Sequence, residues 1–128
     1  GLARILPFAH SLNAEAARRG EIVKVPTTQW APNRSGWAGW LFEVGRILRV
    51  YTGQTGKTCV EVEVCNPKGA HKFGTYVKRY VAANVFDGSR DVAFAQHFYD
   101  ECKATGTWEN AVGSAWIEYL ISIGAVKA

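Results

Sequence analysis

The stretch YTGQTGKTCVEVEV, from Tyr51 to Val64, has the residue types most suggestive of chemistry, because Gly56-Lys57-Thr58 matches the end of a phosphate-binding loop. Such a loop follows the pattern GxxxxGK(S/T) and opens a helix whose N-terminus holds the phosphates. Here Tyr51 stands where the first Gly is required, and Thr58 opens a run of alternating valines. Both the spacing and the context therefore argue against a nucleotide-binding loop.

A β-hairpin explains the same stretch better. Gly53 and Lys57 can flank a three-residue loop that ends in Gly56, and the third position of such a loop takes the left-handed geometry that glycine adopts at no steric cost. The strands then alternate correctly, with valines on one face and charged residues on the other. This register predicts the pairs Val50–Val60, Leu48–Val62 and Arg49–Glu61.

Residues that serve catalysis do not occur at catalytic spacing. The three His residues are far apart, and no second Cys/His pair completes a zinc site. Glu61 and Glu63 share one strand face, where Arg49 opposite favours ion pairs over a catalytic pair of carboxylates. We therefore expect no catalytic residues, no metal and no cofactor, and a chain that is not an enzyme.

The cysteines and the hydropathy indicate the cellular compartment in which the protein is expected. Cys59 and Cys65 lie about 20 Å apart on one expected strand and cannot form a disulfide. Three cysteines without framework spacing favour reduced thiols and an intracellular setting, whether nuclear, cytoplasmic or organellar. No apolar run approaches the ~20 residues that span a bilayer, so no membrane contact is expected. A chain that lacks Met and begins at Gly1 fits a tag remnant, a cut domain edge or a processed terminus, and a place in a larger protein or assembly.

The charge is unevenly distributed along the 128 residues. Residues 25–84 hold eight basic and three acidic residues, a net +5, whereas residues 85–128 hold three and six, a net −3. A basic centre beside an acidic tail suggests that the middle segment faces an anion.

Aromatic residues gather near the same basic segment. Trp30, Trp37 and Trp40 lie in one loop with Arg34. These side chains either cover the open end of a small barrel or form an exposed surface for stacking bases or holding a cationic side chain. The predicted nucleic-acid or peptide contacts are Trp30, Arg34, Trp37, Arg46, Arg49, Lys57, Lys72, Lys78 and Arg79, and the candidates for an aromatic cage are Trp30, Trp37, Tyr51 and Phe73.

Turn and cap residues predict the elements that position these side chains. An N-terminal arm and short helix, residues 1–20, should end at Gly20. Strands are expected in GEIVKVP, LFEVGRILRVY, TCVEVEVC and TYVKRYV, with a short helical turn near 82–85. Two antiparallel helices should follow, the first from Ser89 to Gly106 and the second from Thr107 to Gly124.

The strand LFEVGRILRVY has one irregular feature. Gly45 within it indicates a bulge or a bend, as a curved barrel needs. One face would be apolar but interrupted by Arg46, since its other members are Phe42, Val44, Leu48 and Val50.

These motifs resemble a family. From Gly20 to about Phe86, the strand GEIVKVP, the long loop, GWAGWLFEVGRILRVY, the tight turn, TCVEVEV and KFGTYVKRYVAANVF resemble a small Src-homology-3-like barrel of the Tudor or chromo-barrel kind. The resemblance implies a small antiparallel barrel (21–86). With the N-terminal arm and helix, and a helical hairpin (87–128) whose apolar stripes should pack on the barrel, the expected fold is α+β and a single domain, 1–128.

The resemblance and the charge together give two functional hypotheses. The first is a non-catalytic module that binds DNA or RNA, with basic residues on the phosphates and Trp30 or Trp37 stacked on bases. The second is a module that reads a methyl-lysine or proline-rich peptide, or that assembles with a partner protein, through the Trp-rich loop or the terminal helices.

Overall fold

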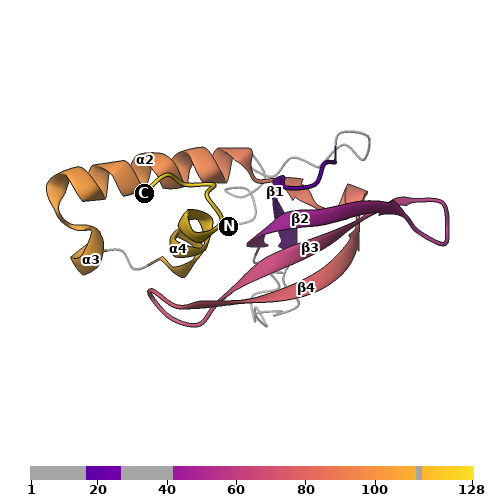
Figure 1. Ribbon diagram of the computed structural model, residues 1–128, viewed down its shortest axis with the longest axis horizontal. Coiled ribbons are helices and arrows are strands. Elements are labelled where there is room, and N and C mark those ends of the chain that lie inside the picture. The colour runs from indigo at the N-terminus through magenta and orange to yellow at the C-terminus, as the bar shows by residue number, and fades with distance from the viewer. Residues whose placement is uncertain (1–16, 27–41, 112–113) are drawn as a thin grey trace, which may run out of the picture. The chain divides into compact units, whose positions relative to one another are not determined.

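The computed structural model describes residues 17–26, 42–111 and 114–128. The predicted N-terminal arm and helix, up to residue 16, and the Trp-rich segment 27–41 lie outside these ranges. Figure 1 shows the described elements. They are β1 (Ile22–Pro26), β2 (Phe42–Thr52), β3 (Thr58–Pro67), β4 (Phe73–Val81), the 3-10 turn η3 (Ala82–Asn84), β5 (Phe86–Asp87), α2 (Ser89–Thr105), α3 (Trp108–Ala111) and α4 (Ala115–Ser122).

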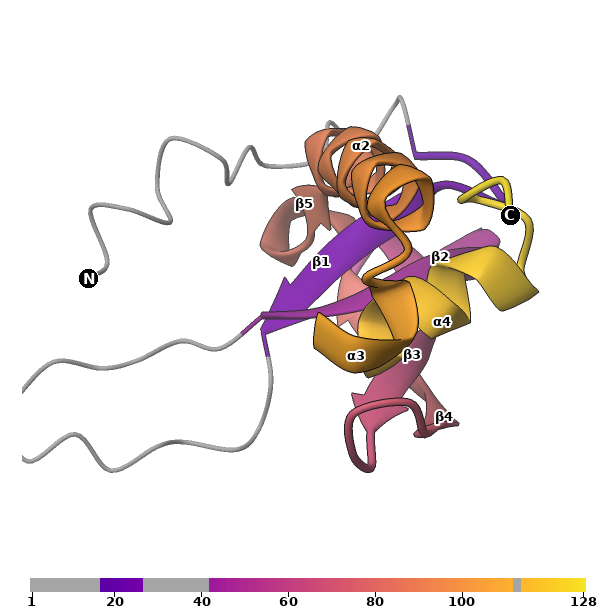
Figure 2. The same ribbon diagram turned by 90° about the vertical axis from the view of Figure 1, so that its left-hand side faces the viewer.

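The strands form one antiparallel sheet in the order β4-β3-β2-β1-β5; β1, β2 and β5 are seen from a second side in Figure 2. The predicted closed barrel is wrong, because among the described residues β4 and β5 stand at opposite edges of an open sheet. β5 has two residues. The Gly88 N–H continues its pairing with β1, because it donates to the Ile22 carbonyl at 3.0 Å, and a Cβ at Gly88 would lie 2.9 Å from that oxygen. Helix α2 then begins at Ser89.

The chain divides into two compact units. The first contains the described residues up to Val64 together with Val77–Gly88, and the second contains Cys65–Tyr76 and Ser89–Ala128. The expectation of a single domain with the helices packed on the sheet stays a prediction.

The first unit has an aliphatic core on one face of its strands. The alternation predicted for TCVEVEVC is confirmed, because the three valines of β3 have no exposed surface. Phe42 and Phe86 add an edge-to-face contact at 5.1 Å between ring centroids. The buried hydrophobic residues of this unit include Val23, Val25, Ile47, Val60, Val62, Val64, Ala82 and Val85.

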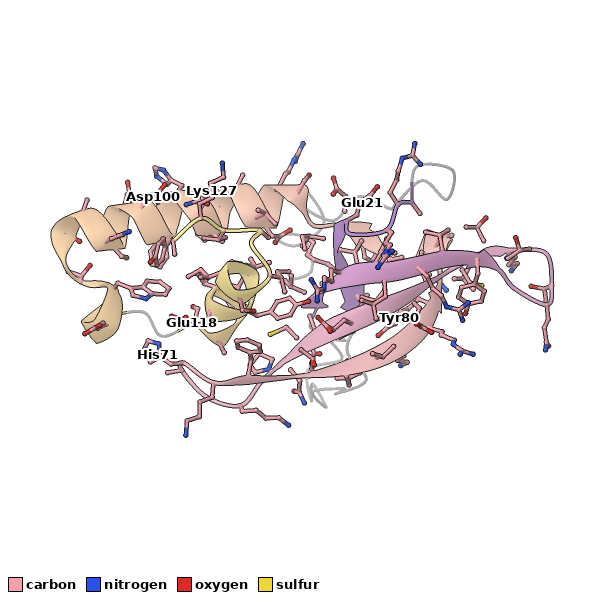
Figure 3. All side chains as sticks on the ribbon, viewed as in Figure 1. Glu21, His71, Tyr80, Asp100, Glu118 and Lys127 are labelled. Carbon is pink, nitrogen blue, oxygen red and sulfur yellow. The ribbon has the colours of Figure 1, made fainter. Side chains whose placement is uncertain are left out.

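The second unit is built around α4, whose Tyr119 and Leu120 are buried. The Tyr119 ring meets Phe73 edge-to-face at 5.5 Å. Gln96 of α2 fastens the C-terminus, because its side-chain amide accepts from the Lys127 N–H at 2.7 Å and donates to the Lys127 carbonyl at 3.0 Å. The Gln96 amide also donates to Asp100 at 3.0 Å, which lies near Lys127 in Figure 3.

The helix ends agree with the glycine signals, but the second helix does not form as one piece. Gly106 and Gly124 have φ of 71° and 77°, as the predicted helix ends require. Ser114, with an extended backbone of φ −93° and ψ 111°, is the N-cap residue before α4, so α3 and α4 are separate helices. The predicted second helix from Thr107 to Gly124 is therefore wrong as a single element.

Glu21, labelled in Figure 3, precedes β1 and has a pKa raised above its ordinary value of 4.5. Burial is the largest cause and Asp87 adds to it, whereas Arg18 lowers the pKa through its charge and a backbone hydrogen bond. The folded state thus binds this proton more tightly than the unfolded chain. At pH values above the raised pKa, ionised Glu21 lowers the free energy of unfolding. This loss disappears as the pH falls below the ordinary pKa.

We therefore expect Glu21→Gln to raise the free energy of unfolding near pH 7 and to leave it unchanged near pH 3, as urea titrations at the two values would measure. An equal gain at both pH values would contradict this origin of the effect.

Candidate functional site

The hairpin that joins β2 to β3 has the predicted turn. The Gly53 N–H donates to the Lys57 carbonyl at 2.8 Å, and the Gly56 N–H donates to the Gly53 carbonyl at 3.0 Å. Gly56 has a φ of 81°, so the left-handed third loop position is confirmed. Gly53 also has a packing role, because a Cβ there would lie 2.8 Å from the Cys59 sulfur. A phosphate-binding loop is excluded in this segment, since a strand and not a helix follows Lys57.

The register of this hairpin changes once along its length. The predicted pairs Val50–Val60 and Arg49–Glu61 are confirmed, but Val62 pairs with Ile47 and not with Leu48. The cause is an irregularity between Ile47 and Arg49, where β2 holds one residue more than β3. A bulge of this kind shifts the alternation of side chains by one residue, so residues beyond it point to the face opposite to the one that unbroken alternation would give.

The bulge corrects in part the prediction that Arg46 interrupts an apolar face. Arg46 still shares a face with Phe42 and Val44, but Val50 lies on the opposite face. On the turn side of the bulge, Arg49 lies opposite Glu61, and on the other side Arg46 lies opposite Glu63. Both arginines therefore occupy the face that bears the glutamates. The expected bulge or bend at Gly45 is also displaced, since the irregularity lies at Leu48.

Ion pairs connect the charged residues of this face. The Arg46 Nε lies 3.2 Å from a Glu63 oxygen, and the Arg49 Nε lies 3.5 Å from Glu61 Oε2. Arg79 of β4 approaches the same Glu61 oxygen with its Nε at 3.4 Å. We call this set the arginine face: Arg46, Arg49, Tyr51, Glu61, Glu63 and Arg79.

The arginine side chains are the outer members of these pairs. Those of Arg46, Arg49 and Arg79 are 38%, 50% and 66% exposed, while those of Glu63 and Glu61 are 23% and 21% exposed. A carboxylate beside Nε covers one edge of the planar guanidinium, which leaves N–H donors on the opposite edge. Glu61 thus orients Arg79 through a hydrogen bond from its Nε. The Arg46 Nε is buried without a hydrogen-bond partner, so Glu63 holds Arg46 by charge, and the three guanidinium groups form a positive outer layer.

Tyr51 supports the central arginine of this face. The Arg49 guanidinium carbon lies 4.4 Å from the Tyr51 ring centroid, a cation–π arrangement. Arg49 is thereby held by an aromatic ring on one side and by Glu61 on the other. Such support restricts the rotamers of a half-exposed side chain before any ligand arrives.

The remaining predicted basic contacts are dispersed. Lys57 is exposed at the turn of the same hairpin. Lys78 alternates with Arg79 along β4, so it projects from the opposite face, where its Nζ lies 5.4 Å from the Tyr80 ring centroid. Lys72 belongs to the second unit. Trp30, Arg34 and Trp37 lie outside the described residues.

The proposed aromatic cage has only two described members, and these belong to different units. Tyr51 is occupied by Arg49, and Phe73 packs against Tyr119. For these two side chains the contacts are internal, with an arginine of the chain over one ring and a core tyrosine against the other. The cage hypothesis therefore depends on Trp30 and Trp37.

The His and Cys residues of the described ranges do not form a candidate metal site. Within 17–26, 42–111 and 114–128 no group of three or more His, Cys, Asp or Glu could hold a metal ion. Cys59, Cys65 and Cys102 are free thiols, as predicted, and the latter two are buried. His71 Nδ1 lies 3.9 Å from a Glu118 oxygen within the second unit; both residues are labelled in Figure 3. No helix in the described part of the chain is long and apolar enough to cross a bilayer.

The sequence contains one signal for the bulge. Arg46 and Arg49 are three residues apart, whereas their partners Glu63 and Glu61 are two apart. Two cross-strand charge pairs with unequal spacing require one extra residue in the wider strand. A register set by the turn alone overlooks this mismatch.

Comparisons with models of protein families, with curated proteins and with solved structures found no match to this chain.

Proposed function

We propose that this chain is a non-catalytic module that binds nucleic acid, and that the arginine face holds its phosphate backbone. The observation that carries the proposal is the placement of Arg46, Arg49 and Arg79 outside the glutamates that pair with them. A guanidinium with one edge fixed by a carboxylate presents its other donors to a second anion in a set orientation.

The spacing of the arginines suits a polyanion better than a single small anion. Arg46 and Arg49 lie along one strand, on the same face but on either side of a bulge, and Arg79 comes from β4, beyond β3. The three arginines therefore spread both along β2 and across the sheet to β4. Phosphates repeated along a chain can meet such an array one after another.

The proposal predicts binding that weakens steeply with salt. Neutralised phosphates release counterions, so the logarithm of the binding constant should fall linearly with the logarithm of the salt concentration, by about 0.9 per phosphate contact on duplex DNA. Three contacts give a slope of roughly −2.7. The experiment is a fluorescence anisotropy titration of the full chain with labelled duplex and single-stranded DNA and RNA, from about 50 to 200 mM salt.

Binding that is insensitive to salt, or no binding to any of these probes, would contradict the proposal. In that event the peptide-reading or assembly hypothesis would take precedence, and the same assay with methyl-lysine and proline-rich peptides would examine it. A peptide that binds through apolar and cation–π contacts should show little dependence on salt.

A further inference from the structure

The tip of the β2–β3 hairpin is a second feature of the first unit, and the ion pairs of the arginine face do not involve it. We define the hairpin tip as Thr52–Thr58. The ladder between β2 and β3 continues to the pair Thr52–Thr58, and all residues from Gln54 to Lys57 are exposed. Figure 1 shows β2 and β3 continuing as a paired ribbon to this turn.

The side chains of the tip can form hydrogen bonds with the edges of nucleic-acid bases. Its side chains are Thr, Gln and Lys, and the segment Val50–Val60 contains no Asp or Glu. Gln pairs with adenine edges, Lys with guanine O6 and N7, and Thr with either a polar group or the thymine methyl. Only Lys57 is charged, so the tip differs in chemistry from the arginine face.

The dimensions of the ribbon match one kind of groove. Two antiparallel strands lie about 4.8 Å apart, and the major groove of B-form DNA, about 12 Å wide and 8.5 Å deep, admits a two-stranded β-ribbon. Arg49 lies four residues before Gly53, about 13 Å along the strand at ~3.3 Å per residue. A tip at the groove floor would thus leave Arg49 near the rim, where the phosphates run.

From this geometry we infer that the preferred ligand is duplex DNA, with the hairpin tip in the major groove and the arginine face on the flanking phosphates. The inference rests on the proposed function and deepens it. The deep, narrow major groove of an RNA duplex does not admit side chains, and a single strand has no groove. Duplex DNA should therefore bind more tightly than duplex RNA or single-stranded DNA of the same sequence.

The test compares these three probes at one salt concentration and adds a variant of the tip. Gln54→Ala with Thr55→Ala removes two side chains but no charge, and it keeps Gly53, Gly56 and the Lys57 carbonyl that form the turn. We expect its affinity for duplex DNA to fall by about tenfold or more with an unchanged salt slope. Protection of guanine N7 from dimethyl sulfate reports on the major groove, and because Lys57 is the tip residue suited to guanine N7, Lys57→Ala should lose this protection.

The matched control is Asn84→Ala, an exposed polar residue of η3 outside the segment Thr52–Thr58, which should keep both affinity and protection. The inference is wrong and the proposed function stands if binding is salt-dependent but single strands or duplex RNA bind as well as duplex DNA. The same holds if the Gln54→Ala/Thr55→Ala variant binds duplex DNA as tightly as the parent, or if Lys57→Ala retains the N7 protection. If none of the probes binds with a salt-dependent affinity, both are wrong.

Discussion

Replacement of Arg46, Arg49 and Arg79 together by Gln should lower the affinity for duplex DNA by roughly two to three orders of magnitude near 0.1 M salt. Each phosphate contact contributes about 0.9 to the salt slope, so the slope should become less negative by about 2.7. The glutamates left behind would add repulsion of the phosphates. Anisotropy titrations at several salt concentrations measure both the affinity and the slope.

A control must separate the arginine face from net charge. Arg19→Gln, Lys103→Gln and Lys127→Gln remove the same number of positive charges at exposed positions off this face. This control should lose only the long-range attraction and keep most of the salt slope. Equal losses in the two triple variants would contradict a site at Arg46, Arg49 and Arg79. Because exposed ion pairs contribute at most about 1 kcal/mol each to folding, all these variants should remain folded.

Glu61 offers an independent check of the same arrangement. If Glu61 only orients the two arginines that share its Oε2 atom, then an amide at this position keeps an acceptor and removes a negative charge from the face. The competing repulsion between carboxylate and phosphate would then decrease. The arginine face is thus a balance between orientation, which the carboxylates provide, and attraction, which they oppose.

Local signals in the sequence were sufficient for the hairpin but not for the closure of the sheet. The turn and its first strand pairs follow from Gly56, whose φ of 81° few other residues adopt. Barrel closure depends instead on whether the edge strands can meet. Here β5 has two residues, α2 begins at Ser89, and β4 and β5 stand at opposite edges of the sheet. No pattern of alternating residues reports how two distant edge strands are placed.

In the candidate site, too, some features follow from local sequence signals and others do not. The cross-strand pair Arg49–Glu61 could be predicted, because it depends on the register near the turn. Arg46 and Arg79 were also among the predicted contacts, but their placement beside Arg49 could not be predicted from the turn, because one depends on the bulge at Leu48 and the other on the neighbour of β3 in the sheet. Sequence proximity also grouped Lys78 with Arg79, although alternation along β4 separates their faces.

Gly45→Ala should be the most destabilising small substitution in the first unit. A Cβ at this position would lie 2.5 Å from the Glu63 carbonyl oxygen, 2.7 Å from Val62 Cγ1 and 3.1 Å from Val64 Cα. Two of these atoms belong to the β3 backbone, so no change of rotamer relieves the clash and the strands must separate. We expect a loss of about 2–3 kcal/mol and a fall in Tm of roughly 10 °C, measured by thermal unfolding.

Gly69→Ala is the matched control, since no atom lies within 4 Å of its added Cβ, and its Tm should stay within about 2 °C of the parent chain. Gly45 immediately precedes Arg46 and pairs with Val64 beside Glu63, so separation of β2 from β3 here should also loosen the Arg46–Glu63 pair. A Gly45→Ala chain that still folds should therefore bind DNA more weakly, whereas Gly69→Ala should bind as the parent does. Equal melting temperatures for the two variants would show that β2 and β3 do not approach each other this closely.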